Sequence, residues 1–280
     1  MDHRPGGGLR AELVHPLEQG GQTLKWMHHG QVMGIIARMT FLEQVSNRLP
    51  WAVVLVWGIG TGLAILATTG AEMTQGAMMG ALFRIGAVFS LTAAVITSMA
   101  REFNDRRVEA TLALAIPRAV YLGGKLTGFI LTALPMALLF GLGLLPFAPW
   151  EQTLLWGISL GYELILMAAF SLLLVLTLTH VTRALLIAMA LWMLARSIHA
   201  MILMASTPLA ELNPLSGTWV TPILKFISWL LPDLGRFTSG EWLLHHTGRW
   251  QDLGTLTLET LFTLFLLCGA GLYDFYKKDL

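Results

Sequence analysis

The stretch REFNDRRVEATLALAIPR, residues 101–118, is a charged segment with helical spacing, and it lies between two long apolar runs at 80–100 and 122–147. Pro117 near its end is poorly tolerated inside a helix, so a helix in this segment is expected to end there. Apolar runs of about twenty residues are long enough to cross a bilayer as helices. The stretch is therefore predicted to be a solvated connector between two membrane-spanning helices.

The rest of the chain repeats this alternation of apolar runs and short polar segments. Of its 280 residues, 55% are hydrophobic and 12% are charged, about half the charged share of an ordinary soluble domain. The only cysteine is Cys268, so an intrachain disulfide is excluded. We predict an all-α polytopic membrane protein with six transmembrane helices. Their approximate ranges are 51–70, 80–100, 122–147, 153–178, 184–205 and 252–274.

The basic residues predict the orientation, because cytoplasmic segments of membrane proteins carry an excess of Lys and Arg. The segments between spans fall into two alternating sets, with thirteen basic residues in one and three in the other. Both termini are therefore expected in the cytoplasm, and the protein in a bacterial-type inner membrane. No cleavable signal peptide is expected, since the first fifty residues contain no apolar core of the required length. The larger set is Arg4, Arg10, Lys25, Arg38, Arg48, Arg101, Arg106, Arg107, Arg118, Lys125, Arg183, Lys277 and Lys278, and the smaller set is Lys225, Arg236 and Arg249.

The N-terminal part divides into two segments. Residues 1–29 are rich in Gly and His without a period, and we predict a flexible cytoplasmic leader before a membrane domain spanning 30–280. Residues 31–49 are predicted to form an amphipathic interfacial helix on the cytoplasmic side, which ends at Pro50. A short soluble helix packed on a partner is the alternative. The apolar face of the helix predicted at 31–49 carries Val32, Ile35, Ile36, Met39, Leu42 and Leu49, and Arg38, Gln44, Asn47 and Arg48 lie away from this face.

The longest loop, residues 206–250, is predicted on the outer side. Its apolar stretch from Trp219 to Leu231 is too short to cross a membrane. We predict a second interfacial helix there, on the outer face.

No nucleotide-binding motif is present in the chain. A P-loop needs a glycine-rich run that ends in Gly-Lys-Ser/Thr. The nearest match, LGGKL at 122–126, lacks the first glycine and the hydroxyl residue. The chain is therefore not expected to be an enzyme that hydrolyses ATP by this route.

The connector combines acidic residues with its arginines. Glu102 and Glu109 are seven residues apart, which places both carboxylates on one helical face, and Arg118 follows Pro117. An ordinary solvated loop that merely satisfies the charge bias is the alternative. The wider pattern is Arg101-Glu102-Phe103…Arg107…Glu109…Leu112…Pro117-Arg118…Tyr121…Gly124-Lys125…Gly128.

This pattern resembles the connector between spans two and three of ABC transporter permeases of the type-2 (ABC-2) exporter family, in the branch associated with multi-copper enzyme maturation. The resemblance extends over most of the chain, but the long leader departs from the family. It implies an exporter working by alternating access, with a second permease subunit in a homodimer or heterodimer. It also implies a separate ABC ATPase subunit that holds ATP and Mg, so no cofactor is expected in this chain. The ATPase-coupling residues are then Arg101, Glu102, Arg106, Arg107, Glu109, Pro117 and Arg118.

Three charged residues lie deep inside the predicted spans, several residues in from the outer ends, namely Glu163, Arg196 and Glu259. Each would cost several kcal/mol if it faced lipid alone, so they are expected to face the interior or one another. We predict that Arg196 bridges to Glu163, to Glu259 or to both, either as a static ion pair or with a role in transport. Arg84, near the outer start of its span, is expected to extend to the interface without a special role.

Other site chemistry has little support in the sequence. The adjacent pairs His28/His29 and His245/His246 are poorly spaced for joint metal ligation, so no metal site is predicted. No nucleophile–base pair supports an intramembrane enzyme, and neither nucleic acid nor a particular substrate is indicated. A membrane anchor or assembly factor of a respiratory or redox complex is the competing function. Glycines four residues apart permit close packing of helices within one subunit or between two: these are Gly58/Gly62, Gly76/Gly80 and Gly157/Gly161.

Overall fold

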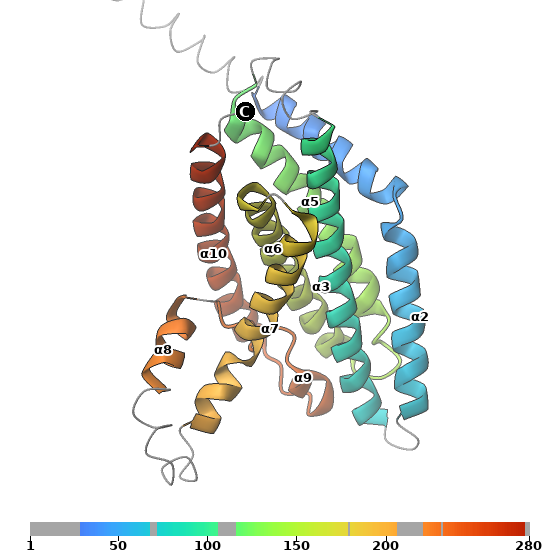
Figure 1. The fold of residues 1–280 in the computed structure, drawn as a ribbon. Helices are drawn as coiled ribbons and strands as arrows, with labels where there is room; N and C mark the ends of the chain where they lie inside the picture. Colours follow the sequence, from blue (N-terminus) through green and yellow to red (C-terminus); the bar gives the residue numbers. More distant parts are fainter. Residues whose placement is uncertain are drawn as a thin grey trace, which may run out of the picture.

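The computed structural model describes residues 29–67, 72–105, 116–178, 180–205, 221–230 and 232–277, and over these ranges the regular structure is helical (Figure 1). Six helices are long and apolar enough to cross a membrane, so the prediction of an all-α polytopic membrane protein is confirmed at this level. The six are α2 (Leu49–Ala67), α3 (Glu72–Asn104), α5 (Arg118–Leu142), α6 (Trp150–Thr177), α7 (Val181–Ala205) and α10 (Trp250–Lys277).

Within the described residues, three shorter helices accompany the six. One covers residues 29–46, and the others are α8 (Thr221–Leu230) and α9 (Gly240–Leu244). The first of them does not end at Pro50 as predicted, because the turn lies at Asn47 and Arg48 and Pro50 is the second residue of α2. In the first turn of a helix the missing N–H of proline removes no backbone hydrogen bond. The prediction that Pro50 ends the first helix is therefore wrong.

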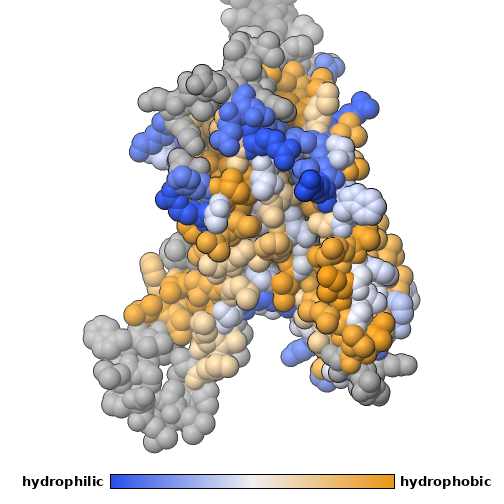
Figure 2. Space-filling model, turned by 45° about the vertical axis from the view of Figure 1, so that its right-hand side comes forward, coloured by the Kyte–Doolittle hydropathy of each residue, from blue (hydrophilic) through white to orange (hydrophobic). Residues whose placement is uncertain are grey.

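The two ends of the helix bundle differ in character. Helix 29–46, the end of α3, the start of α5 and the end of α10 lie at one end, and α8 and α9 lie towards the other (Figure 1). We call the first the connector end and the second the opposite end. Figure 2 shows hydrophilic residues gathered towards the connector end, with apolar residues over most of the face below them. This distribution fits a bundle whose connector end emerges from a membrane.

The centre of the bundle is α6, which packs against α3, α5 and α10. In the spanning segment of α6, 67% of the residues are buried, against 22% for α2 and 17% for α10. Trp156, Phe83 and Phe140 are among the largest fully buried side chains and fill the space between α3, α5 and α6. The outer helices therefore expose most of their apolar surface, as expected where lipid or another subunit replaces water.

The glycine pairs have different environments. A Cβ atom added at Gly157 would lie 3.5 Å from the Cα atom of Gly141, so the backbones of α5 and α6 meet at this point within one chain. At Gly58 and Gly62 an added Cβ would meet nothing within 4 Å among the described residues. Close packing explains the pair on α6 but not the pair on α2.

Candidate functional site

The connector is described only at its two ends. Residues 106–115 lie outside the described residues, and Arg106, Arg107 and Glu109 lie there with them. Arg101 is exposed in the last turn of α3, and Pro117 is exposed as the residue that precedes α5. These two positions are compatible with contact to a partner at the connector end.

Glu102 has a different environment from the one expected. Its side chain is buried, with 7% of the residue exposed, and the Tyr121 hydroxyl donates a 2.6 Å hydrogen bond to its Oε2 atom. The Lys125 ammonium, also buried, forms an ion pair with its Oε1 atom. A carboxylate removed from water needs such partners, because its desolvation is otherwise very costly. Glu102 is therefore not solvated, although the connector was predicted to be, and its role in ATPase coupling remains a prediction.

Arg118 connects the start of α5 to the end of α10. Its Nη1 atom donates hydrogen bonds to the carbonyl oxygens of Phe275, at 2.7 Å, and Tyr276, at 3.3 Å. The guanidinium carbon lies 5.6 Å from the centre of the Phe275 ring. The last carbonyls of a helix have no partner within the helix, so a cation at this point satisfies them. Arg118 thus acts within this chain, whether or not it also contacts a partner.

Helix 29–46 crosses α5 at two glycines. A Cβ atom at Gly124 would lie 2.8 Å from the Cβ atom of Ile36, and one at Gly128 would lie 2.6 Å from that of Thr40. Glycine is required at both positions because the two backbones are nearly in contact. Gln44, which was predicted to lie on the solvated face, is instead completely buried. That placement was wrong because the buried residues of this helix are Ala37, Thr40 and Gln44, so the side that packs on the bundle is not the predicted apolar face.

The other face of helix 29–46 is exposed and apolar. It includes Ile35, with 60% exposed, and Met39, with 64% exposed. Such a face is what a helix in a membrane interface would present to lipid. The location of this helix in the interface remains a prediction.

A second polar cluster lies towards the opposite end, around the fully buried carboxylate of Glu163. Its Oε1 atom accepts a hydrogen bond from Trp192 Nε1 at 2.8 Å and lies 3.3 Å from Arg196 Nη1. Its Oε2 atom accepts a hydrogen bond from the Thr238 hydroxyl at 2.9 Å. The predicted bridge between Arg196 and Glu163 is therefore present.

Arg196 also holds a segment of the loop before α10. It donates hydrogen bonds to the carbonyl oxygens of Leu234, at 3.0 Å, and Phe237, at 3.3 Å. Thr238 is fully buried and has a positive φ of 47°, an uncommon conformation for a threonine. Its backbone N–H donates a 2.9 Å hydrogen bond to the Ser159 hydroxyl. These bonds fix the loop inside the bundle.

Two expectations about charges in the spans need correction. Arg84 does not extend to the interface, because its Nη1 atom donates a 2.9 Å hydrogen bond to the Thr238 carbonyl oxygen inside the cluster. Glu259 is not part of this cluster. It accepts a hydrogen bond from the Asp233 backbone N–H at 3.1 Å and lies 3.9 Å from Arg236 in a partly exposed pair.

Three residues of the Glu163 cluster were not predicted from the sequence: Ser159, Trp192 and Thr238. Two of them left a signal: Trp192 lies four residues before Arg196 on α7, and Ser159 lies four residues before Glu163 on α6, so each pair shares a helical face. Thr238 is distant in sequence from α6 and α7, and its inward position follows from the path of the loop.

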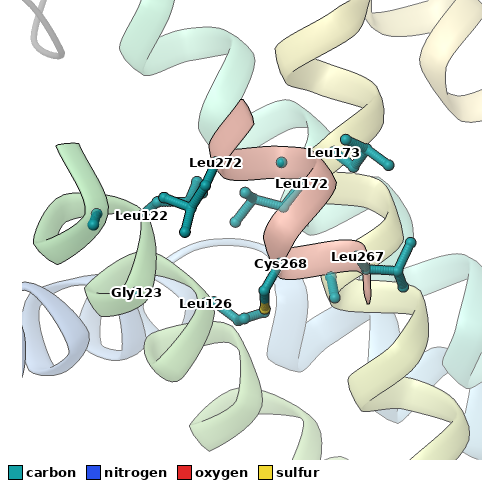
Figure 3. Close-up of a pocket in the computed structure, with 11 residues that line it drawn as sticks. Leu122, Gly123, Leu126, Leu172, Leu173, Leu267, Cys268 and Leu272 are labelled. Carbon is teal, nitrogen blue, oxygen red and sulfur yellow. The ribbon is translucent and has the colours of Figure 1, made fainter. Parts of the chain in front are cut away.

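The hollows in the described structure are apolar. One, of about 220 Å³, lies between α5 and α6. Another, of about 70 Å³, is lined by leucines of α5, α6 and α10 together with Cys268 (Figure 3). No Asp, Glu, Lys, Arg or His lines either hollow; apart from Cys268, their only polar side chains are Thr153 and Tyr162 of the larger one.

His, Cys, Asp and Glu side chains in the described ranges are the candidate metal ligands. No group of three or more His, Cys, Asp or Glu there is arranged to hold a metal ion. His28 and the side chain of His199 lie outside what the structure describes.

The described residues thus contain two polar clusters, one at the connector end and one around Glu163 in the middle of α6. No protein-family model matches this chain, and neither does any curated protein. We therefore infer its function from the architecture, the connector and these clusters.

Proposed function

We propose that the chain is the permease subunit of an ATP-driven exporter of the ABC-2 type. A separate ATPase subunit, which holds ATP and Mg, would bind the connector and drive alternating access in a dimer of permease subunits. The protein would lie in a bacterial-type inner membrane with both termini in the cytoplasm. The substrate class is left open.

The observation that carries the proposal is the position of the connector. It joins two of six apolar helices at the end of the bundle where hydrophilic residues gather (Figure 2). Arg101 is exposed there, in the last turn of α3. An energy source outside the membrane acts most directly through such a segment, since it continues into spanning helices on both sides.

The geometry divides the proposed coupling residues into two groups. Exposed Arg101 and Pro117, together with Arg106, Arg107 and Glu109, are proposed to contact the ATPase. Glu102 and Arg118 already have partners within the chain. The resemblance of the connector to that of ABC-2 permeases supports the first assignment, and the bonds of the described residues support the second.

The cluster around Glu163 is proposed to be structural. Its groups hold the loop before α10 inside the bundle, and each carboxylate oxygen has a donor. Neither of the two apolar hollows is lined by a residue of this cluster. A static role accounts for these bonds without assigning them to transport.

The proposal is tested by co-purification with candidate ABC ATPase subunits of the same organism, beginning with any that a neighbouring gene encodes. The wild-type chain, solubilised in detergent, is expected to retain the ATPase. Glu109→Lys is expected to retain less of it, because a docking site complementary to Glu109 would be positively charged and would repel the lysine. Lys225→Met, a charge change on exposed α8, is the control and should behave like the wild type. If the wild type retains no ATPase, the permease assignment fails and the membrane-anchor function becomes the better explanation.

A further inference from the structure

Three spanning helices are joined to one another at the connector end by five residues. These residues come from the last turn of α3, the first turns of α5 and the last turn of α10, and we call them the connector clasp: Glu102, Arg118, Tyr121, Lys125 and Phe275. Two of its residues, Glu102 and Arg118, lie at the two ends of the connector.

The first half of the clasp fixes α3 to α5. Glu102 and Lys125 are separated by 23 residues of sequence, with the connector between them, and both are buried. A buried ion pair resists separation, because removing one partner leaves the other charge desolvated and unpaired. Tyr121 adds a 2.6 Å hydrogen bond to the same carboxylate. The ends of α3 and α5 are therefore held at a fixed separation.

The second half of the clasp fixes α5 to α10. Arg118 directly follows Pro117, so it moves with the end of the connector, and it holds the Phe275 carbonyl oxygen at 2.7 Å. Tyr121 lies nearly one turn further along α5, and its ring stacks on that of Phe275 with 6.1 Å between centroids. Phe275 is completely buried. A displacement of the connector therefore acts on α10 as well as on α5.

Helix 29–46 supports the clasp from the side. Its backbone lies against Gly124 and Gly128, on either side of Lys125 in the sequence. On the same helix, Glu43 accepts a 3.2 Å hydrogen bond from the Ser98 hydroxyl of α3. This packing limits sideways movement of α5, so a force on the connector is directed along the helices.

We infer that the connector clasp transmits movement of the connector to α5 and α10, and that Glu102 and Lys125 are positioning residues of coupling rather than docking residues. The inference rests on the proposed function. It differs from that function in separating two steps, because binding of the ATPase would depend on exposed connector residues and transmission would depend on the buried clasp.

The test measures binding and transmission in the same preparation. Spin labels are attached at Leu142 and Gln251, exposed positions at the far ends of α5 and α10, in a Cys268→Ser background. Labelled subunits are diluted with unlabelled ones and purified with the ATPase that co-purification identifies. The distance distribution is recorded by double electron–electron resonance without nucleotide and with ATP and vanadate.

In the wild type a nucleotide-dependent shift in distance is expected. Lys125→Met should retain the ATPase and lose the shift, and the charge exchange Glu102→Lys with Lys125→Glu should regain it. Lys225→Met removes an exposed lysine from α8 and serves as the matched control, with an unchanged shift. If Lys125→Met does not fold, Tyr121→Phe decides, because it removes one hydroxyl and keeps the ring on Phe275, and its shift should be reduced.

Two results would overturn this inference and leave the proposed function standing. One is a full shift in Lys125→Met, or in Tyr121→Phe if that variant decides. The other is loss of the ATPase from Lys125→Met despite normal folding, which would assign the pair to docking. A wild type that binds no ATPase overturns the proposed function and the clasp together, so the two failures are distinguishable.

Discussion

Replacing Arg196 by methionine removes the only cation that contacts the buried carboxylate of Glu163 in the described structure. Breaking a buried pair in this way typically costs about 3–5 kcal/mol, because an unpaired charge remains. Two features favour the lower end of that range. The Arg196–Glu163 separation of 3.3 Å is longer than an ideal charge-assisted bond. Trp192 and Thr238 also keep their hydrogen bonds to the carboxylate.

We therefore expect Arg196→Met to lower the free energy of unfolding by about 3 kcal/mol. At about 2–4 °C per kcal/mol for a chain of this size, the melting temperature falls by about 6–12 °C. Differential scanning fluorimetry of the detergent-solubilised protein measures this change. Glu163→Gln in the same chain should recover a large part of it, since the neutral amide oxygen still accepts from Trp192 and leaves no buried charge.

Either of two results would show that Arg196 does not stabilise the Glu163 carboxylate. One is a free energy of unfolding for Arg196→Met within about 1 kcal/mol of the wild-type value, as is typical of an exposed pair. The other is an Arg196→Met/Glu163→Gln double variant that is no more stable than Arg196→Met. Interaction energies between contacting residues are commonly about 0.5–3 kcal/mol, so the full double-mutant cycle resolves the coupling.

Three further predictions concern other contacts. Gly128→Ala should destabilise the protein by about 1–3 kcal/mol, because its Cβ would overlap the N-terminal helix; Gly58→Ala, with open space around it, should melt like the wild type, and equal effects would disprove the packing argument. Glu259→Gln should cost less than about 1 kcal/mol, since its pair is partly exposed, and a larger loss in thermal melts would contradict this. Arg118→Ala should increase hydrogen exchange in the last turn of α10, whose carbonyls it holds; unchanged protection there would show that the contact has no stabilising effect.

Much of the fold was predictable because membrane spans have a strong sequence signal. Runs of about twenty apolar residues must form helices in a bilayer, since backbone groups have no other hydrogen-bond partners there. The structure accordingly has six such helices close to the predicted ranges. Their ends were less predictable, and α3 (Glu72–Asn104) is longer than its predicted span at 80–100. Polar residues continue a helix beyond the apolar run without changing its hydropathy signal.

The sequence by itself determined that Glu163 and Arg196 need partners, because the cost of a bare charge in an apolar bundle follows from residue type and depth alone. Only the tertiary structure decided which partners they have. Glu163 is paired with Arg196 and Glu259 is not, since the loop before α10 brings Thr238 between α6 and α7 and leaves Glu259 beside Arg236. In the same way, helical spacing placed Glu102 and Glu109 on one face, but Lys125 and Tyr121 draw Glu102 inward. Spacing fixes which side chains share a face, and the packing of distant segments decides which face is buried.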